Sequence, residues 1–116
     1  MNERIKAIIV DDEALARDSL RDALKDFDDI TIIKECTNGF DAVREVQQSQ
    51  PDLVFMDIQL ADGLSFDIFD QVSIEVPVIF ITAYQEYAIR AFKVNSVDYL
   101  LKPVTYARFL KSVNRC

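Results

Sequence analysis

Five polar residues follow apolar runs of the chain, and their types indicate a particular chemistry. They are Asp11, Asp12, Asp57, Thr82 and Lys102. Carboxylate oxygens are hard ligands that suit a partly hydrated Mg²⁺ ion, and a lysine ammonium group is a flexible point charge for an anion. A cation, an anion and an aspartate that can accept a covalent bond are the components of phosphoryl transfer, in which positioning and charge neutralisation do most of the work.

Other catalytic chemistries are disfavoured by the residues that the chain lacks. It has no histidine, which removes the commonest general base and the commonest metal ligand. Its two cysteines, Cys36 and Cys116, have neither the number of a disulfide framework nor the spacing of a zinc site, and we expect both to be free thiols. The chemistry must therefore use oxygen ligands and lysine.

The apolar runs predict the elements that position these residues. Five short runs are expected to be strands, at residues 8–10, 30–33, 53–56, 78–81 and 97–101. Segments with helical spacing lie between or after them, at residues 16–27, 42–46, 64–72, 88–92 and 106–113, with Asn38 as a cap for the second. Alternating strands and helices predict an α/β fold with a five-stranded parallel sheet covered on both faces.

The carboxyl ends of parallel strands form the ligand edge of such a sheet. If the strand order is 2-1-3-4-5, the first and third strands are neighbours about 4.8 Å apart, which brings Asp11, Asp12 and Asp57 within reach of one another. Lys102 lies two strands from Asp57, roughly 10 Å away, and its stem spans that distance. Three aspartates and one lysine carry a formal charge of −2, which one Mg²⁺ cancels. We therefore expect a magnesium site that accepts an anion.

Length and charge exclude several classes of protein. The 116 residues predict one domain covering 1–116. The net charge of −7 opposes nucleic-acid binding by this domain, because phosphate binding needs a basic surface. No apolar run is long enough for a membrane span, and no signal peptide is evident, so we expect a cytoplasmic protein that does not bind membranes.

The sequence resembles the receiver domains of two-component response regulators over residues 5–113. Four motifs in the right order carry the resemblance: Ile9-Val10-Asp11-Asp12, Leu53-Val54-Phe55-Met56-Asp57, Thr82-Ala83 and Leu101-Lys102-Pro103. The resemblance implies a flavodoxin-like sheet of order 2-1-3-4-5 and a cis Lys102–Pro103 bond. It also implies a switch that is no enzyme beyond catalysing its own phosphotransfer and dephosphorylation.

The resemblance also implies roles for the individual residues. Asp57 would be phosphorylated by a phosphohistidine of a sensor histidine kinase. Asp12 and Asp57 would bind Mg²⁺ directly with the Gln59 main-chain carbonyl, and Asp11 would bind it through water. The implied phosphoryl-binding groups are the Thr82 hydroxyl, the Ala83 main-chain amide and the Lys102 ammonium group.

Phosphorylation adds charge and acceptor oxygens, and the family resemblance implies that the switch responds by drawing Thr82 inward. Tyr99 would then fill the space behind Thr82, and the fourth helix, fifth strand and fifth helix would repack, which is also the surface expected for a homodimer. Gln59 and Tyr84 occupy positions that tune hydrolysis in the family. Because Tyr84 is bulky enough to shield the phosphoryl group, we expect slow self-dephosphorylation.

A narrower resemblance links the chain to the receivers of LytTR-type (LytR/AlgR-like) regulators. It rests on residues 82–92, TAYQEYAIRAF, and on residues 98–103, DYLLKP. Those regulators usually carry a carboxy-terminal LytTR DNA-binding domain. The resemblance therefore implies an output domain that is absent from this chain and through which DNA would be bound.

Alternative functions and structural roles stay open at this stage. A stand-alone receiver would act through protein contacts only. A magnesium-dependent phosphatase of the haloacid dehalogenase type needs a second aspartate two residues after the nucleophile, where this chain has Gln59, and a flavin or nucleotide carrier needs a phosphate cradle where this chain reads Asp-Asp-Glu. Taken singly, Asp11, Asp12 and Thr82 could each be helix caps.

The charged residues near the carboxyl end of the chain have two explanations. They would form ion pairs across a receiver dimer or belong to a solvated surface. The residues concerned are Arg90, Lys93, Asp98, Arg108 and Lys111.

Overall fold

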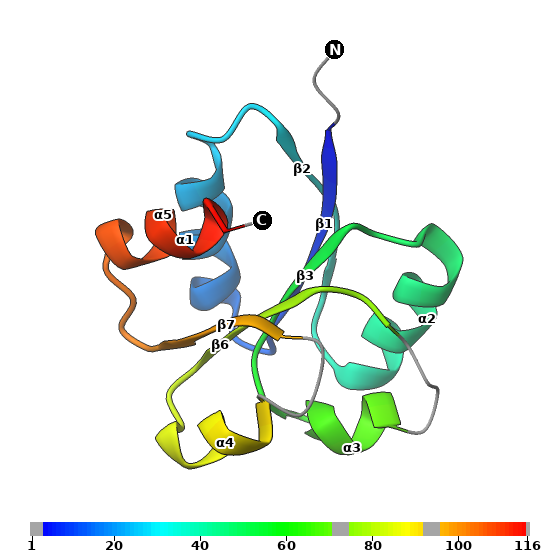
Figure 1. Cartoon of the computed structure of the whole chain (residues 1–116). Helices are drawn as coiled ribbons and strands as arrows, with labels where there is room; N and C mark the ends of the chain where they lie inside the picture. Colours follow the sequence, from blue (N-terminus) through cyan, green and yellow to red (C-terminus); the bar gives the residue numbers. More distant parts are fainter. Residues whose placement is uncertain (1–3, 71–74, 92–95, 116) are drawn as a thin grey trace.

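A five-stranded parallel sheet forms the centre of the molecule (Figure 1). The computed structural model describes residues 4–70, 75–91 and 96–115. The strands are β1 (Ile5–Val10), β2 (Ile30–Cys36), β3 (Leu53–Met56), β6 (Val78–Thr82) and β7 (Ser96–Leu101). Their order in the sheet is β2-β1-β3-β6-β7. Since β6 and β7 are the fourth and fifth strands of this sheet along the chain, the predicted order 2-1-3-4-5 is confirmed.

Helices cover both faces of the sheet (Figure 1). They are α1 (Ala14–Leu24), α2 (Gly39–Ser49), α3 (Ser65–Asp70), α4 (Ala88–Ala91) and α5 (Tyr106–Val113). Successive strand residues point to opposite faces, so Ile8 packs with residues of α2, α3 and α4 while Ile9 packs with residues of α1 and α5. All residues of β3 and β6 are buried, which explains why these strands read as continuous apolar runs.

Side-chain caps fix the starts of two helices. The Asn38 side chain accepts a hydrogen bond from the Asp41 N–H at 2.8 Å, as the sequence predicted for α2. Thr105 accepts one from the Arg108 N–H and starts α5. The N-cap of α1 is Glu13, which makes no side-chain cap hydrogen bond. Neither Asp11 nor Asp12 therefore caps this helix.

Several predicted element bounds differ from the structure. A short antiparallel pair, β4 (Gln59–Leu60) with β5 (Gly63–Leu64), follows β3 and was not predicted. It takes up Leu64, the expected first apolar residue of a helix, so α3 starts one residue later. A 3₁₀ turn, η1 (Gln85–Tyr87), precedes α4, and α1 ends at Leu24, before Phe27. The predictions for Val72, Phe92, Lys93 and Cys116 lie outside the described residues.

Two further sequence predictions concern the thiol at the end of β2 and membrane spans. Cys36 is a buried free thiol, as expected, and burial raises its pKa to about 11. Among the described residues, no helix combines the length and the apolar character that crossing a bilayer requires.

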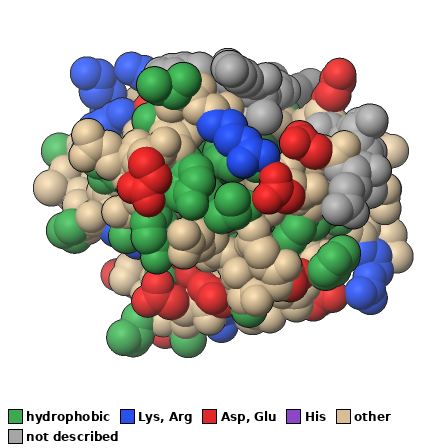
Figure 2. Space-filling view, turned by 90° about the horizontal axis from the view of Figure 1, so that it is seen from below, with side chains coloured by type: hydrophobic (Ala, Val, Ile, Leu, Met, Phe, Trp, Pro, Cys, Tyr) green, Lys and Arg blue, Asp and Glu red, His purple; other side chains and the backbone are tan. Residues whose placement is uncertain are grey.

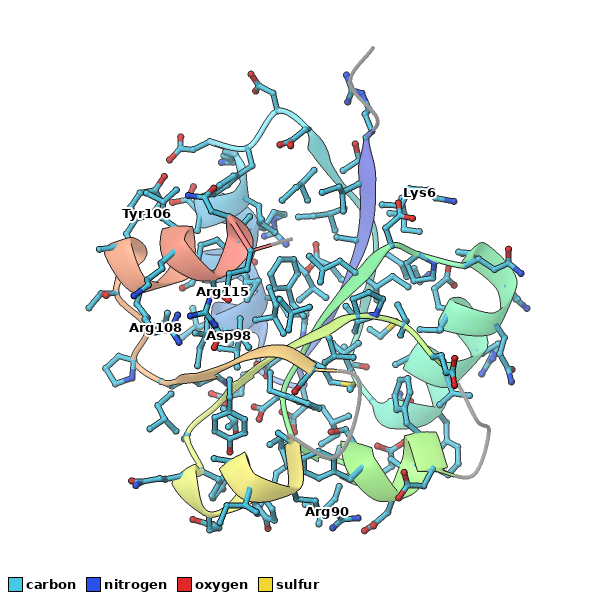
Figure 3. The ribbon with its side chains drawn as sticks, viewed as in Figure 1. Lys6, Arg90, Asp98, Tyr106, Arg108 and Arg115 are labelled. Carbon is cyan, nitrogen blue, oxygen red and sulfur yellow. The ribbon has the colours of Figure 1, made fainter. Side chains whose placement is uncertain are left out.

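Ion pairs within the chain connect α5 to β7 and α4 to α3; Arg108, Arg115 and Asp98 of the first connection are labelled in Figure 3. The two terminal nitrogens of the Arg108 guanidinium group, Nη1 and Nη2, each donate to the Asp98 carboxylate at 2.9 Å, and Arg115 Nη1 lies 3.5 Å from the same carboxylate. Arg90 of α4 donates to Asp67 of α3 at 2.7 Å. In this structure Arg90, Asp98 and Arg108 therefore pair inside the chain.

Asp98 ties β7 to α5 through a charge-assisted pair. Burial pushes the pKa of Asp98 up, but hydrogen bonds from Arg108 and from the Tyr99 N–H outweigh it, and the pKa falls below its ordinary 3.8. The pair therefore makes its full contribution to the stability of the fold above pH 3.8, and this contribution is lost as the pH falls through the lower, folded-state pKa of Asp98.

We predict that Asp98→Asn lowers the free energy of unfolding at pH 7 by about 1–3 kcal/mol, the usual cost of losing hydrogen bonds to a charged group. The difference from the wild type should shrink as the pH is lowered toward and below 3.8. Urea titrations between pH 7 and pH 3 measure it. A difference that is unchanged across this range would contradict the ionic origin of the stabilisation.

Candidate functional site

The sheet brings the predicted site residues to one edge. Main-chain hydrogen bonds continue the ladder beyond the strands: the Asp57 N–H donates to the Val10 carbonyl at 3.0 Å and the Lys102 N–H to the Thr82 carbonyl at 2.8 Å. The carboxyl ends of β1, β3, β6 and β7 therefore present their next side chains together. Figure 2, a view from below Figure 1, shows acidic side chains near a basic one on that face.

Four carboxylates gather at this edge. One oxygen from each of Asp11, Asp12, Glu13 and Asp57 lies within 4.8 Å of the others. Asp11 and Asp57 are each only 6% exposed, whereas Asp12 and Glu13 are exposed. The structure thus brings together the three predicted aspartates and adds Glu13, which sequence reasoning did not include among the ligands. The signal for Glu13 was its place as the third acidic residue after the first strand.

Lys102 lies against the two buried aspartates. Its Nζ atom is 2.9 Å from Asp11 Oδ2 and 3.0 Å from Asp57 Oδ2, and it is 3.7 Å from Glu13 Oε1. Burial alone would lower the pKa of Lys102, but the hydrogen bonds to Asp11 and Asp57 outweigh this effect and raise it above its ordinary 10.5. The ammonium group is therefore charged at neutral pH.

Asp11 accepts hydrogen bonds from Glu13 and Arg17 in addition to the one from Lys102. Its Oδ1 accepts a hydrogen bond from the Glu13 N–H at 2.9 Å, and its carbonyl accepts one from Arg17 Nη1 at 2.8 Å. Burial raises the pKa of Asp11, and the bonds from Glu13 and Lys102 offset this only in part, so the pKa stays above 3.8. Arg17 is a residue that sequence reasoning missed, since an arginine in an amphipathic helix carries no signal of its own.

The remaining predicted residues are spread over several elements: Gln59 starts β4, Thr82 ends β6 and is followed by Ala83 and Tyr84, and Tyr99 lies on β7. Thr82 is fully buried, and its Oγ1 accepts a hydrogen bond from the Tyr84 N–H at 3.3 Å. The Tyr99 hydroxyl donates to the Tyr84 carbonyl. Ala83 is exposed. Gln59 is partly buried and donates through Nε2 to the Tyr87 hydroxyl at 3.4 Å. The described contacts thus join Thr82, Tyr84 and Tyr99 to one another rather than to the carboxylates.

The donor set fits a magnesium ion. All four candidate side-chain ligands are carboxylates, the hard oxygen donors that Mg²⁺ prefers. They carry four negative charges against the one positive charge of Lys102, which leaves −3 rather than the predicted −2 because Glu13 belongs to the cluster. Mutual repulsion in a partly buried cluster favours capture of a divalent cation. The exposed Asp12 and Glu13 leave the cluster accessible from solvent.

We predict that Asp11→Asn stabilises the metal-free protein at pH 7. A carboxyl group whose pKa is raised by burial in the folded state destabilises the fold when ionised, so removing its charge should raise the Tm. Calorimetry in the presence of a chelator measures it. The gain should diminish as the pH approaches 4, and a lower Tm for the variant at pH 7 would contradict the inferred cost of ionising this buried carboxyl group.

Comparison with known proteins identifies relatives. The sequence profile of the response regulator receiver domain matches residues 7–114. An uncharacterized response regulatory protein of Yersinia pestis is 42% identical over 113 residues, which are 96% of this chain and 48% of that protein. The transcriptional regulatory protein BtsR of Salmonella typhi is also 42% identical, over 96% of this chain and 47% of its own. The sensory transduction protein LytT of Bacillus cereus is 40% identical, with shares of 96% and 46%.

These matches agree with the fold. The crystal structure of the response regulatory domain of mrkE from Klebsiella pneumoniae superposes with a TM-score of 0.86 at 28% identity, covering 96% of this chain and 93% of that one. The chain spans about half the length of the curated relatives it matches. Among those relatives, the name LytT is consistent with the narrower resemblance to LytTR-type regulators. The chain belongs to the receiver domain family of response regulators and is a phosphorylation-activated switch of two-component signalling.

Proposed function

We propose that Asp57 accepts a phosphoryl group from the phosphohistidine of a sensor histidine kinase. The observation that supports this most is the position of Asp57, which is buried at the sheet edge between an acidic cluster and the Lys102 ammonium group. An Asp57 carboxylate oxygen forms a bond to phosphorus as the bond from phosphorus to the imidazole nitrogen breaks. The imidazole leaves with the electron pair of that bond.

Three groups would hold Mg²⁺ directly in this proposal: the Asp12 and Asp57 carboxylates and the Gln59 main-chain carbonyl. Asp11 would act through a water molecule. The ion supplies positive charge that offsets the carboxylates and the incoming phosphoryl oxygens. Glu13 lies within the same cluster and adds negative charge at its solvent side.

The chain's own donors would bind the phosphoryl group. Lys102 already contacts an oxygen of Asp57, so its ammonium group needs only a short movement to bind a phosphoryl oxygen there. The Thr82 hydroxyl and the Ala83 main-chain amide supply further donors from the end of β6. A groove of about 670 Å³, lined by Asp11, Lys102 and residues of α1 and α5, borders the cluster and offers the phosphodonor an approach.

The switch in this proposal runs through Thr82, Tyr84 and Tyr99. Thr82 Oγ1 now accepts from the Tyr84 N–H, and the Tyr84 carbonyl accepts from the Tyr99 hydroxyl. When the Thr82 hydroxyl turns toward a phosphoryl oxygen, it loses the hydrogen bond from the Tyr84 N–H. The hydrogen bond from the Tyr99 hydroxyl to the Tyr84 carbonyl is then weakened as well. Tyr99 then moves on β7, and α4, β7 and α5 repack with a coupling free energy of about 1–3 kcal/mol.

The partners of the whole protein follow from the same proposal. The repacked α4, β7 and α5 surface would form a homodimer. An output domain outside this single receiver domain of residues 1–116 would bind DNA, and the relative named a transcriptional regulatory protein supports this. The receiver itself, with a net charge of −7, would contact no nucleic acid and no membrane. We propose a cytoplasmic location.

We predict that incubation with acetyl phosphate and Mg²⁺ adds one phosphoryl group to the chain and that Asp57→Asn abolishes the addition. The amide of asparagine is not a nucleophile for phosphorus, so the loss should be complete. Intact-mass spectrometry measures the adduct. Asp67→Asn, a change at an exposed aspartate of α3, is the matched control and should be phosphorylated like the wild type. An adduct that survives Asp57→Asn would place the acceptor elsewhere.

We also predict that the phosphorylated wild type loses phosphate more slowly than Tyr84→Glu. Tyr84 is 37% exposed and follows Thr82 by two residues, and in the proposed state its bulky ring would exclude water from the phosphoryl group. A roughly threefold to tenfold difference is expected, since tenfold corresponds to about 1.4 kcal/mol in the barrier. The decay of the mass adduct after donor removal gives both rates. Ile89→Glu adds the same charge on exposed α4 as a control, and equal rates for the wild type and Tyr84→Glu would refute shielding.

A further inference from the structure

One side chain anchors the β4–β5 hairpin to the start of α2. Asp62, in the turn of the hairpin, accepts hydrogen bonds from the Gly39 N–H at 2.9 Å through Oδ1 and from the Phe40 N–H at 3.1 Å through Oδ2. These are the first two N–H groups of α2, which have no partner inside the helix. The negative charge also lies at the positive end of the helix dipole. The contact joins segments 23 residues apart in the sequence.

The packing around this anchor leaves little freedom. Gly39 is buried, and a Cβ atom at that position would lie 2.3 Å from Ile68 Cδ1 and 3.4 Å from Asp62 Oδ1. Gly63, next to Asp62, has a φ of 133°, a conformation that favours glycine. The hairpin turn and α3 are therefore held closely against the first turn of α2.

The hairpin connects this anchor to the candidate metal site. Gln59 pairs with Leu64 and Leu60 with Gly63, and the Ser65 N–H donates to the Ile58 carbonyl at 2.8 Å. The Ile58 N–H in turn donates to Asp57 Oδ1 at 2.6 Å. A continuous set of hydrogen bonds thus fixes the main chain from the turn to Asp57, and the Gln59 carbonyl lies within it.

We propose that Asp62 is a positioning residue for the metal site, which orients the Gln59 carbonyl and the Asp57 carboxylate by fixing the hairpin that carries them. This inference rests on the proposed function. Mg²⁺ demands near-ideal octahedral geometry with ligand distances of about 2.0–2.1 Å, so a small shift of the hairpin weakens binding. Residues that orient metal ligands typically change metal affinity by 10- to 100-fold when substituted.

The test is a titration of the 116-residue chain with Mg²⁺ alone, by calorimetry or tyrosine fluorescence. Asp62→Ala should raise the Kd for Mg²⁺ by roughly tenfold. Asp62→Asn removes the charge and keeps one acceptor oxygen, and we expect a smaller increase. Asp67→Asn removes the same charge from α3 and should bind Mg²⁺ like the wild type. Because Asp62 is exposed, its substitution leaves no buried cavity.

Thermal unfolding of each variant separates positioning from stability. A purely structural role would lower the Tm of Asp62→Ala and leave the Kd of the folded protein unchanged, and that result would overturn the inference. If Asp62→Ala does not fold, Asp62→Asn provides the test. A Kd for Mg²⁺ of Asp62→Asn equal to that of Asp67→Asn would also overturn the inference. Failure of the wild type to bind Mg²⁺ would instead reject the metal site itself, and the inference with it.

Discussion

Repulsion between carboxylates at one edge of the sheet is the constraint on which the site depends. Asp11 and Asp57 are almost fully buried, and a buried carboxylate without a counter-charge is costly. Lys102 contacts both, and the N–H groups of Glu13 and Ile58 each donate to one of them. For Asp11 these contacts do not fully offset the effect of burial, to which the charge of Asp57 adds, and its pKa stays raised. The net negative charge of this cluster is what would let the edge bind a cation and then an anion in the proposed function.

The order of the strands in the sheet brings residues that are distant in the sequence together in this cluster. Because β1 and β3 are neighbours, Asp11 and Asp57 come together although they are 46 residues apart, and Lys102 reaches both across β6. The crossover helices that parallel strands require also bury both faces of the sheet. The strands at the centre of the sheet, β3 and β6, are buried along their whole length, and the functional side chains follow their ends.

Much of this arrangement was predictable from the sequence. The five strands and the Asn38 cap follow from apolar periodicity and capping chemistry, which are local signals, whereas the strand order was implied by the family resemblance. The β4–β5 hairpin was missed because strands of two residues have no periodicity to detect. Arg17 and Glu13 were missed for a different reason. Their contacts with Asp11 and with the cluster depend on loop conformation, which residue types alone do not specify.

The same edge explains why a modification at Asp57 would be felt at β7. Lys102 immediately follows β7, and its N–H is bonded to the Thr82 carbonyl while its ammonium group contacts Asp57. Thr82 is also joined to Tyr99 of β7 through the two main-chain groups of Tyr84. A phosphoryl group would compete for Lys102 and for the Thr82 hydroxyl together. In the proposed switch both routes lead to β7, so a change of charge at Asp57 would act on that strand through Lys102 at its end and through Tyr99 at its side.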